Sequence, residues 1–146
     1  MKGGNNALGC MHLLFDEVKT VGEALHKMEA MTSKFQEAYK EMLDEVTEKH
    51  LPTTTCTIFN PDFPDLTKQH LATTALFFFN GVIMQESSKL GIPVIDYNII
   101  MNKPEDYATS VEPSVLGGDK LTDNIIKVVE EHDFKIKRTV IYAGTN

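Results

Sequence analysis

The chain has 146 residues, of which 42% are hydrophobic, a size and composition that suit one globular domain. Its formal net charge is −7 and its 14 Lys and Arg residues are scattered, which argues against binding to nucleic acid or to an anionic membrane surface. The longest apolar run, Ala75 to Phe79, is far too short to span a bilayer.

The two cysteines, Cys10 and Cys56, are far apart and fit no metal-binding spacing. Free buried thiols are the favoured interpretation, with a disulfide as the alternative. No apolar signal-peptide region follows Met1, so we expect the chain as written to be cytoplasmic. That expectation lapses if an N-terminal segment is missing.

The first ten residues have the composition of a loop. Gly3-Gly4-Asn5-Asn6 favours turns and left-handed backbone, and it exposes amide donors. Such a loop normally follows a strand, and no strand precedes it in this sequence.

Residues 17–50 have a helical pattern, with apolar residues three and four positions apart and Lys and Glu on the opposite face. An unbroken helix of this length would measure roughly 50 Å, which is long for a domain of this size. Ser33 followed by Gln36 resembles a capping box, so we predict a helix or a kinked helix pair with a break near Thr32. The methionines of the stripe are expected to pack in the core.

Residues 53–59 are rich in β-branched side chains and predict a buried strand. After a proline-containing loop, Asp65 can cap a helix over residues 66–90, and Gly91 is a typical C-terminal glycine. The centre of this helix, residues 75–79, is apolar on all sides and predicts deep burial.

Residues 92–96 predict a second parallel strand, continued by residues 99–101. The connection over residues 97–117 is longer than the usual link from strand to helix, so it is either a functional loop or a surface loop held by Pro104 and Pro113. A helix is predicted for residues 118–131, and the tail over residues 134–142 can add a last strand.

This alternation of helices and strands predicts an α/β fold with a parallel sheet and helices on both faces. Two or three strands are few, because an average sheet has about five. We therefore expect the chain to be the incomplete C-terminal part of a larger α/β domain. Such a part would expose a sheet edge and could self-associate through it.

Common catalytic motifs are absent: no nucleophile elbow, dinucleotide-binding glycine motif, phosphate-binding loop or zinc-binding His-Glu-x-x-His occurs. The five histidines share no ligand spacing and are expected at the surface, so we expect neither a metal nor a cofactor. Two loops can carry chemistry. The Gly3–Asn6 loop offers donors for an oxyanion, or is an ordinary turn, and the Glu112–Gly118 loop offers a carboxylate, a hydroxyl and two glycines before a helix.

Together these loops resemble the SGNH (GDSL) hydrolase superfamily. Gly3-Gly4-Asn5-Asn6 is similar to its Gly-x-Asn-Asp block. The run from Ile92 to Asp96, Glu105 to Ala108 and Glu112-Pro113-Ser114 with Gly117-Gly118 is similar to its final block. The resemblance implies a three-layer, flavodoxin-like fold and hydrolysis of a small-molecule ester, as in esterases, lipases and carbohydrate deacetylases.

The resemblance also implies residue roles. Asn5 and the amide of Gly4 would stabilise the oxyanion, Glu112 would act in place of the catalytic base, and Ser114 would assist it. The family's nucleophile sits in a Gly-Asp-Ser block that would lie before Met1. Thr109 and Glu112 stand where the family has Asp and His.

These departures leave two further interpretations open. One is a non-catalytic, degenerate hydrolase that keeps the pocket and binds a ligand. The other is a flavodoxin-like nucleotide or flavin binder that uses the helix start at Gly117-Gly118.

Overall fold

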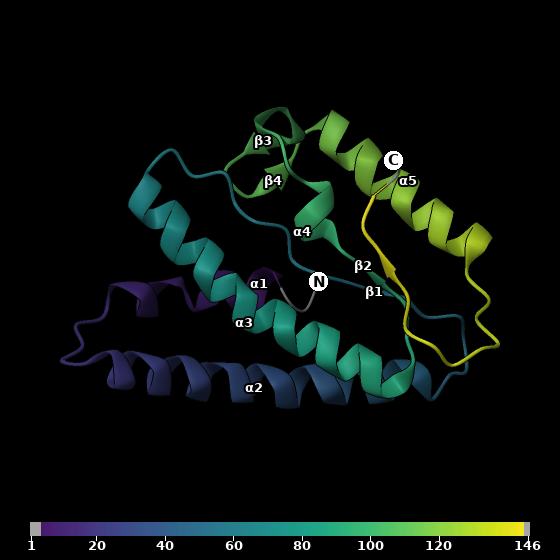
Figure 1. Ribbon diagram of the computed structural model, residues 1–146, viewed down its shortest axis with the longest axis horizontal. Helices are drawn as coiled ribbons and strands as arrows, with labels where there is room; N and C mark the ends of the chain where they lie inside the picture. Colours follow the sequence, from purple (N-terminus) through teal and green to yellow (C-terminus); the bar gives the residue numbers. More distant parts are fainter. Residues whose placement is uncertain (1–3, 145–146) are drawn as a thin grey trace.

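The computed structural model describes residues 4–144, and the account below concerns those residues. Helices, two of them 3-10 helices (η), alternate with short strands along the chain (Figure 1). The elements in order are α1 (Gly4–Gly9), η1 (Met11–Phe15), α2 (Val21–Thr47), β1 (Thr55–Cys56), α3 (Leu66–Leu90), β2 (Val94–Ile95), α4 (Tyr97–Ile100), η2 (Pro104–Asp106), β3 (Tyr107–Thr109), β4 (Glu112–Pro113), α5 (Val115–Glu131) and β5 (Ile141–Tyr142).

A small parallel sheet lies at the centre, with strand order β1-β2-β5 and Thr55, Val94 and Ile141 side by side in register. α3 packs on one face, where the Thr55 and Ser87 hydroxyls are 2.8 Å apart. α5 packs on the other face, where Val128 joins Ile95 in a buried cluster. The predicted α/β class is confirmed. Of the tail predicted as a strand over residues 134–142, only Ile141–Tyr142 (β5) is a strand.

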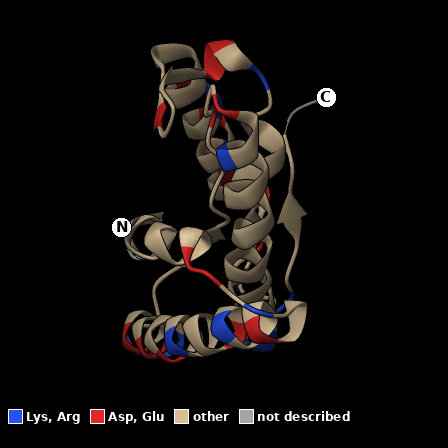
Figure 2. Ribbon diagram, turned by 90° about the vertical axis from the view of Figure 1, so that its left-hand side faces the viewer, with Lys and Arg blue, Asp and Glu red and all other residues tan. Residues whose placement is uncertain are grey.

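α2 is one continuous helix, so the predicted break near Thr32 is wrong. Thr20 caps its N-terminus by accepting a hydrogen bond from the backbone N–H of Glu23 (3.0 Å). Gln36 is not part of a cap, because its side-chain amide donates to Glu86 on α3 (2.6 Å). The local pattern that suggested a helix start is therefore a contact between two helices. The charged residues of α2 lie on the surface away from the rest of the molecule, at the bottom of Figure 2.

α3 begins and ends where the sequence predicts. The Asp65 carboxylate accepts a hydrogen bond from the backbone N–H of Lys68 (2.6 Å), and Gly91 ends the helix with φ of 67°. The predicted burial on all sides is wrong, because Phe77 is 67% exposed while Phe79 is buried. α2 and the sheet cover only part of the circumference of α3. Phe79 meets Phe35 of α2 with ring centroids 4.9 Å apart.

The N-terminal segment is helical, so the predicted loop is wrong for Gly4 onward, and Gly3 lies outside the described residues. α1 and η1 form an arm between α2 and the upper part of the molecule (Figure 2). Ala7, Cys10 and Leu13 pack against the core formed by α2 and α3. Of these three residues only Ala7 belongs to α1, so the packing holds the arm mainly through Cys10 and Leu13.

The connection over residues 97–117 is folded rather than a plain loop. Residues 99–101 do not continue β2, because α4 begins directly after Asp96, whose carboxylate caps it. β3 and β4 form an antiparallel hairpin, and α5 begins at Val115, three residues before its predicted start. None of the described helices combines the length and apolarity needed to cross a membrane.

Candidate functional site

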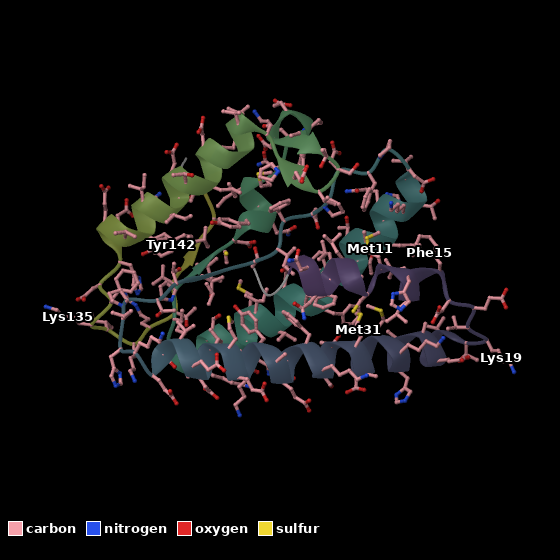
Figure 3. The ribbon with its side chains drawn as sticks, turned by 180° about the vertical axis from the view of Figure 1, so that it is seen from behind. Met11, Phe15, Lys19, Met31, Lys135 and Tyr142 are labelled. Carbon is pink, nitrogen blue, oxygen red and sulfur yellow. The ribbon has the colours of Figure 1, made fainter. Side chains whose placement is uncertain are left out.

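A cavity of about 310 Å³ lies beside the sheet, at the carboxyl ends of β1 and β2. This edge is where parallel α/β sheets usually place ligands, and the volume and apolar lining suit a small-molecule site. The N-terminal arm, α2, α3, the loop after β1 and the β3–β4 hairpin all contribute to the walls. Figure 3 shows Met31 pointing from α2 towards η1, which carries Met11. The apolar wall includes Leu8, Met11, Leu13, Met28, Met31, Phe59, Phe63, Ala72, Leu76, Phe79 and Ile83.

The two sequence blocks singled out as chemically important meet at this cavity. Gly4 and Asn5 line it from α1, and Val111 and Pro113 line it from the hairpin. Glu112 lies between these two hairpin residues but is exposed, and its carboxylate accepts a hydrogen bond from the Thr109 hydroxyl (3.2 Å). The fold therefore brings Asn5, which is exposed, to the cavity wall, whereas Glu112 does not line the cavity.

Ser114 has a structural task at the start of α5. Its hydroxyl accepts a hydrogen bond from the backbone N–H of Gly117 (3.1 Å) and donates to the carbonyl of Glu105 (2.7 Å). Gly117 packs so closely on the backbone carbonyl of Asp106 that a Cβ atom would collide with it. The first turn of α5 is thus capped and covered, which leaves no room for a phosphate at Gly117.

Sequence reasoning missed Asp106, which holds the connection to α5. Its side chain is fully buried, with one carboxylate oxygen 2.6 Å from Lys120 Nζ and the other accepting from the backbone N–H groups of Asn102 and Lys103 (3.1 Å each). Burial by itself would raise the pKa of Asp106, but Lys120 and the two amides together lower it. Pro104 makes the turn before Asp106 recognisable in the sequence. The ion pair of Asp106 with Lys120, fourteen residues later, cannot be recognised there.

A second polar group lies where β1 and β2 end. The Thr57 hydroxyl donates to the Asp96 carboxylate (2.8 Å), and Asn98 donates its backbone N–H to the same carboxylate (3.2 Å). Cys56 and Tyr97 also line the cavity. Burial raises the pKa of the Cys56 thiol, which keeps it protonated at neutral pH and makes it a poor nucleophile.

Within residues 4–144 no serine hydroxyl is hydrogen-bonded to a histidine ring. Ser87 is buried against Thr55, and the ring of His132 contacts the Tyr142 hydroxyl instead (3.2 Å). His12, His26, His50 and His70 are exposed as predicted, and His132 is half-buried. The described residues also contain no group of three side chains arranged to hold a metal ion.

The cavity therefore offers an apolar wall with Asn5 on one side, and the carboxylate of Glu112 lies outside its lining. These groups can bind an apolar ligand and polarise a carbonyl oxygen, and the described residues pair no serine with a histidine. Comparison of the chain with protein-family models, with curated proteins and with solved structures gives no match.

Proposed function

We propose that this chain forms the ligand-binding and oxyanion-binding side of an SGNH-type ester hydrolase with a three-layer, flavodoxin-like fold. The observation that carries the proposal is the cavity at the carboxyl ends of β1 and β2. Gly4 and Asn5 line it from one side, and the hairpin that holds Glu112 lines it from the other. A cavity at the carboxyl ends of parallel strands, with an amide side chain in its wall, supports an acyl-transfer site.

In the proposed reaction, a serine that residues 4–144 do not supply attacks the ester carbonyl. The Asn5 carboxamide donates a hydrogen bond to the oxyanion, and the carboxylate of Glu112 accepts the serine proton during attack. The proton then passes to the alcohol as its C–O bond breaks, and water releases the acyl group from the serine. The apolar part of the ester lies in the cavity, against Met31 and Phe79. Ser114 supports the site indirectly, because its cap fixes the start of α5 behind the hairpin.

The second candidate function is non-catalytic binding of an apolar ligand. Two observations favour it: Glu112 is exposed rather than enclosed beside a nucleophile, and no described serine is paired with a histidine. The cavity itself would be unchanged in this case. The two functions therefore differ in turnover and agree in ligand binding.

The deciding experiment measures binding and turnover separately on the protein joined to the serine-bearing segment that the proposed reaction requires. Binding of a fluorescent fatty-acid analogue reports on the cavity, and release of p-nitrophenol from its octanoate ester reports on hydrolysis. A hydrolase should show both, and Asn5→Ala should lower kcat by about 10²–10³ with little change in ligand affinity. Asn102→Ala, an exposed amide outside the cavity lining, is the matched control.

Binding without turnover would reject the hydrolase and support the binding module. Absence of both would reject any role of the cavity. Hydrolysis that Asn5→Ala leaves unchanged would reject the proposed oxyanion donor.

A further inference from the structure

α5 has an uncharged face that no other described element covers. Its inward face, with Gly117, Leu121, Asn124 and Val128, packs on the rest of the molecule. Each residue of an α-helix is rotated by about 100° from the one before it. By this rotation, a second set of residues lies beside the inward face and covers an arc of roughly 100°. This set, named here the α5 outer face, consists of Val115, Gly118, Thr122, Ile125, Ile126 and Val129.

The apolar side chains of the α5 outer face are open to solvent. Val115 is 84% exposed, Val129 64%, Ile126 48% and Ile125 41%. A Cβ atom added at Gly118 would meet nothing within 4 Å, so the face has a hollow between Val115 and the residues one turn further on. In Figure 1, α5 lies along the outside of the molecule. Isolated exposed apolar residues are common, whereas these four share one helical face and form a continuous apolar stripe.

The spacing of this face fits a helix as its partner. Val115, Gly118, Thr122, Ile125 and Val129 follow one another at intervals of three, four, three and four residues. That repeat is the one at which two helices pack side chains into one another's gaps. The stripe spans fifteen residues, which corresponds to roughly 21 Å or four helical turns.

The charged residues beside the α5 outer face indicate whether its partner is basic or acidic. Next to Ile126 around the helix come Asp119, Glu130 and Asp123, all of them acidic. Lys127 and Lys120 lie further round the helix, and Lys120 forms an ion pair with buried Asp106 at 2.6 Å. The whole chain carries a net charge of −7. An apolar stripe with one acidic border therefore attracts a helix whose apolar stripe has a basic border.

We propose that the α5 outer face docks a basic amphipathic helix of a partner protein. A second copy of this chain would bring the same three carboxylates to the contact, and like charges there oppose pairing. An anionic membrane would be repelled by the same border. The site is separate from the cavity, because none of the six residues of the outer face lines the cavity.

The test uses a labelled eighteen-residue amphipathic peptide of leucine and lysine as the probe, with a leucine–glutamate peptide of the same pattern for comparison. Fluorescence anisotropy at physiological salt should show saturable one-to-one binding of the lysine peptide and at least tenfold weaker binding of the glutamate peptide. Val129→Asp should weaken binding at least tenfold. A variant with Asp119→Lys, Asp123→Lys and Glu130→Lys should do the same.

The control is Glu37→Lys on the exposed surface of α2, which should bind the lysine peptide like the unmodified protein. Circular dichroism of each variant confirms that it is folded, since all the altered side chains lie at the surface. Equal loss of binding in the control, or binding that Val129→Asp leaves unchanged, would overturn the proposal. So would a homodimer in light scattering that Val129→Asp dissociates, or adsorption to phosphatidylglycerol vesicles that the same variant abolishes.

Discussion

Replacing Asp106 with Asn tests the inferred role of this carboxylate in joining the folded connection to α5. The fully buried side chain binds Lys120 through one oxygen and two backbone N–H groups through the other. An Asn at this position keeps an acceptor for the amides but loses the negative charge. It also places an NH₂ group or a neutral oxygen beside Lys120.

The expected cost follows from these contacts. A hydrogen bond to a charged group contributes about 1.5–3 kcal/mol. Removing one member of a fully buried ion pair costs more, about 3–5 kcal/mol. The Lys120 side chain is 31% exposed and can return to water, so the lower range applies. We expect Asp106→Asn to lower the free energy of unfolding by about 2 kcal/mol at pH 7, as measured by urea denaturation.

The pH dependence provides a second, independent check. The pKa of Asp106 is lower in the folded protein, so its charge stabilises the fold above the unfolded pKa of about 4. This stabilisation is lost as the pH falls through the folded pKa. The difference between the unmodified protein and Asp106→Asn should therefore be constant between about pH 7 and 5 and shrink towards pH 3.

Asp119→Asn is the matched control, because Asp119 is an exposed carboxylate on α5, next to Lys120. It should change stability by less than about 0.5 kcal/mol. The reasoning is refuted if both variants lose the same stability at pH 7. It is refuted as well if the deficit of Asp106→Asn persists unchanged at pH 3.

Three further substitutions test the packing around the sheet, each by urea denaturation. Gly91→Ala should cost more than about 2 kcal/mol, because φ is 67° and the added Cβ would lie 2.8 Å from the backbone of Lys137; an unchanged midpoint would contradict this. Asn80→Leu should cost about 2 kcal/mol, since the Asn80 amide bonds both the N–H (2.8 Å) and the C=O (2.9 Å) of Ile58. Phe79→Ala should cost about 3–5 kcal/mol by opening the α2–α3 core, and a loss below 1 kcal/mol would reject its central place there.

The chemistry proposed at the cavity was only partly visible in the sequence. Asn5 and Glu112 were predicted to lie near strand ends, and the structure places both blocks at one cavity. Their surroundings were not predictable, because exposure of Glu112 and the capping role of Ser114 depend on how the hairpin folds against η2 and α5. Asp106 escaped notice because its significance comes from complete burial beside Lys120.

The sequence by itself determined those features whose signals lie within a few residues of one another. Asp65 and Gly91 bound α3, the repeat of apolar residues marks α2 as a helix, and the apolar stretch at residues 92–96 marks β2. Capping and side-chain periodicity act locally, so local patterns are sufficient to predict them.

The tertiary structure decided everything that depends on which surfaces meet. The N-terminal arm packs on the core through Ala7, Cys10 and Leu13, and Gln36 of the unbroken α2 reaches Glu86 on α3. The same helix pattern is buried at Phe79 and exposed at Phe77, and on α5 it is buried at Val128 and exposed at Val129. Burial is a property of the neighbours that a side chain meets, and three-dimensional packing alone brings those neighbours together.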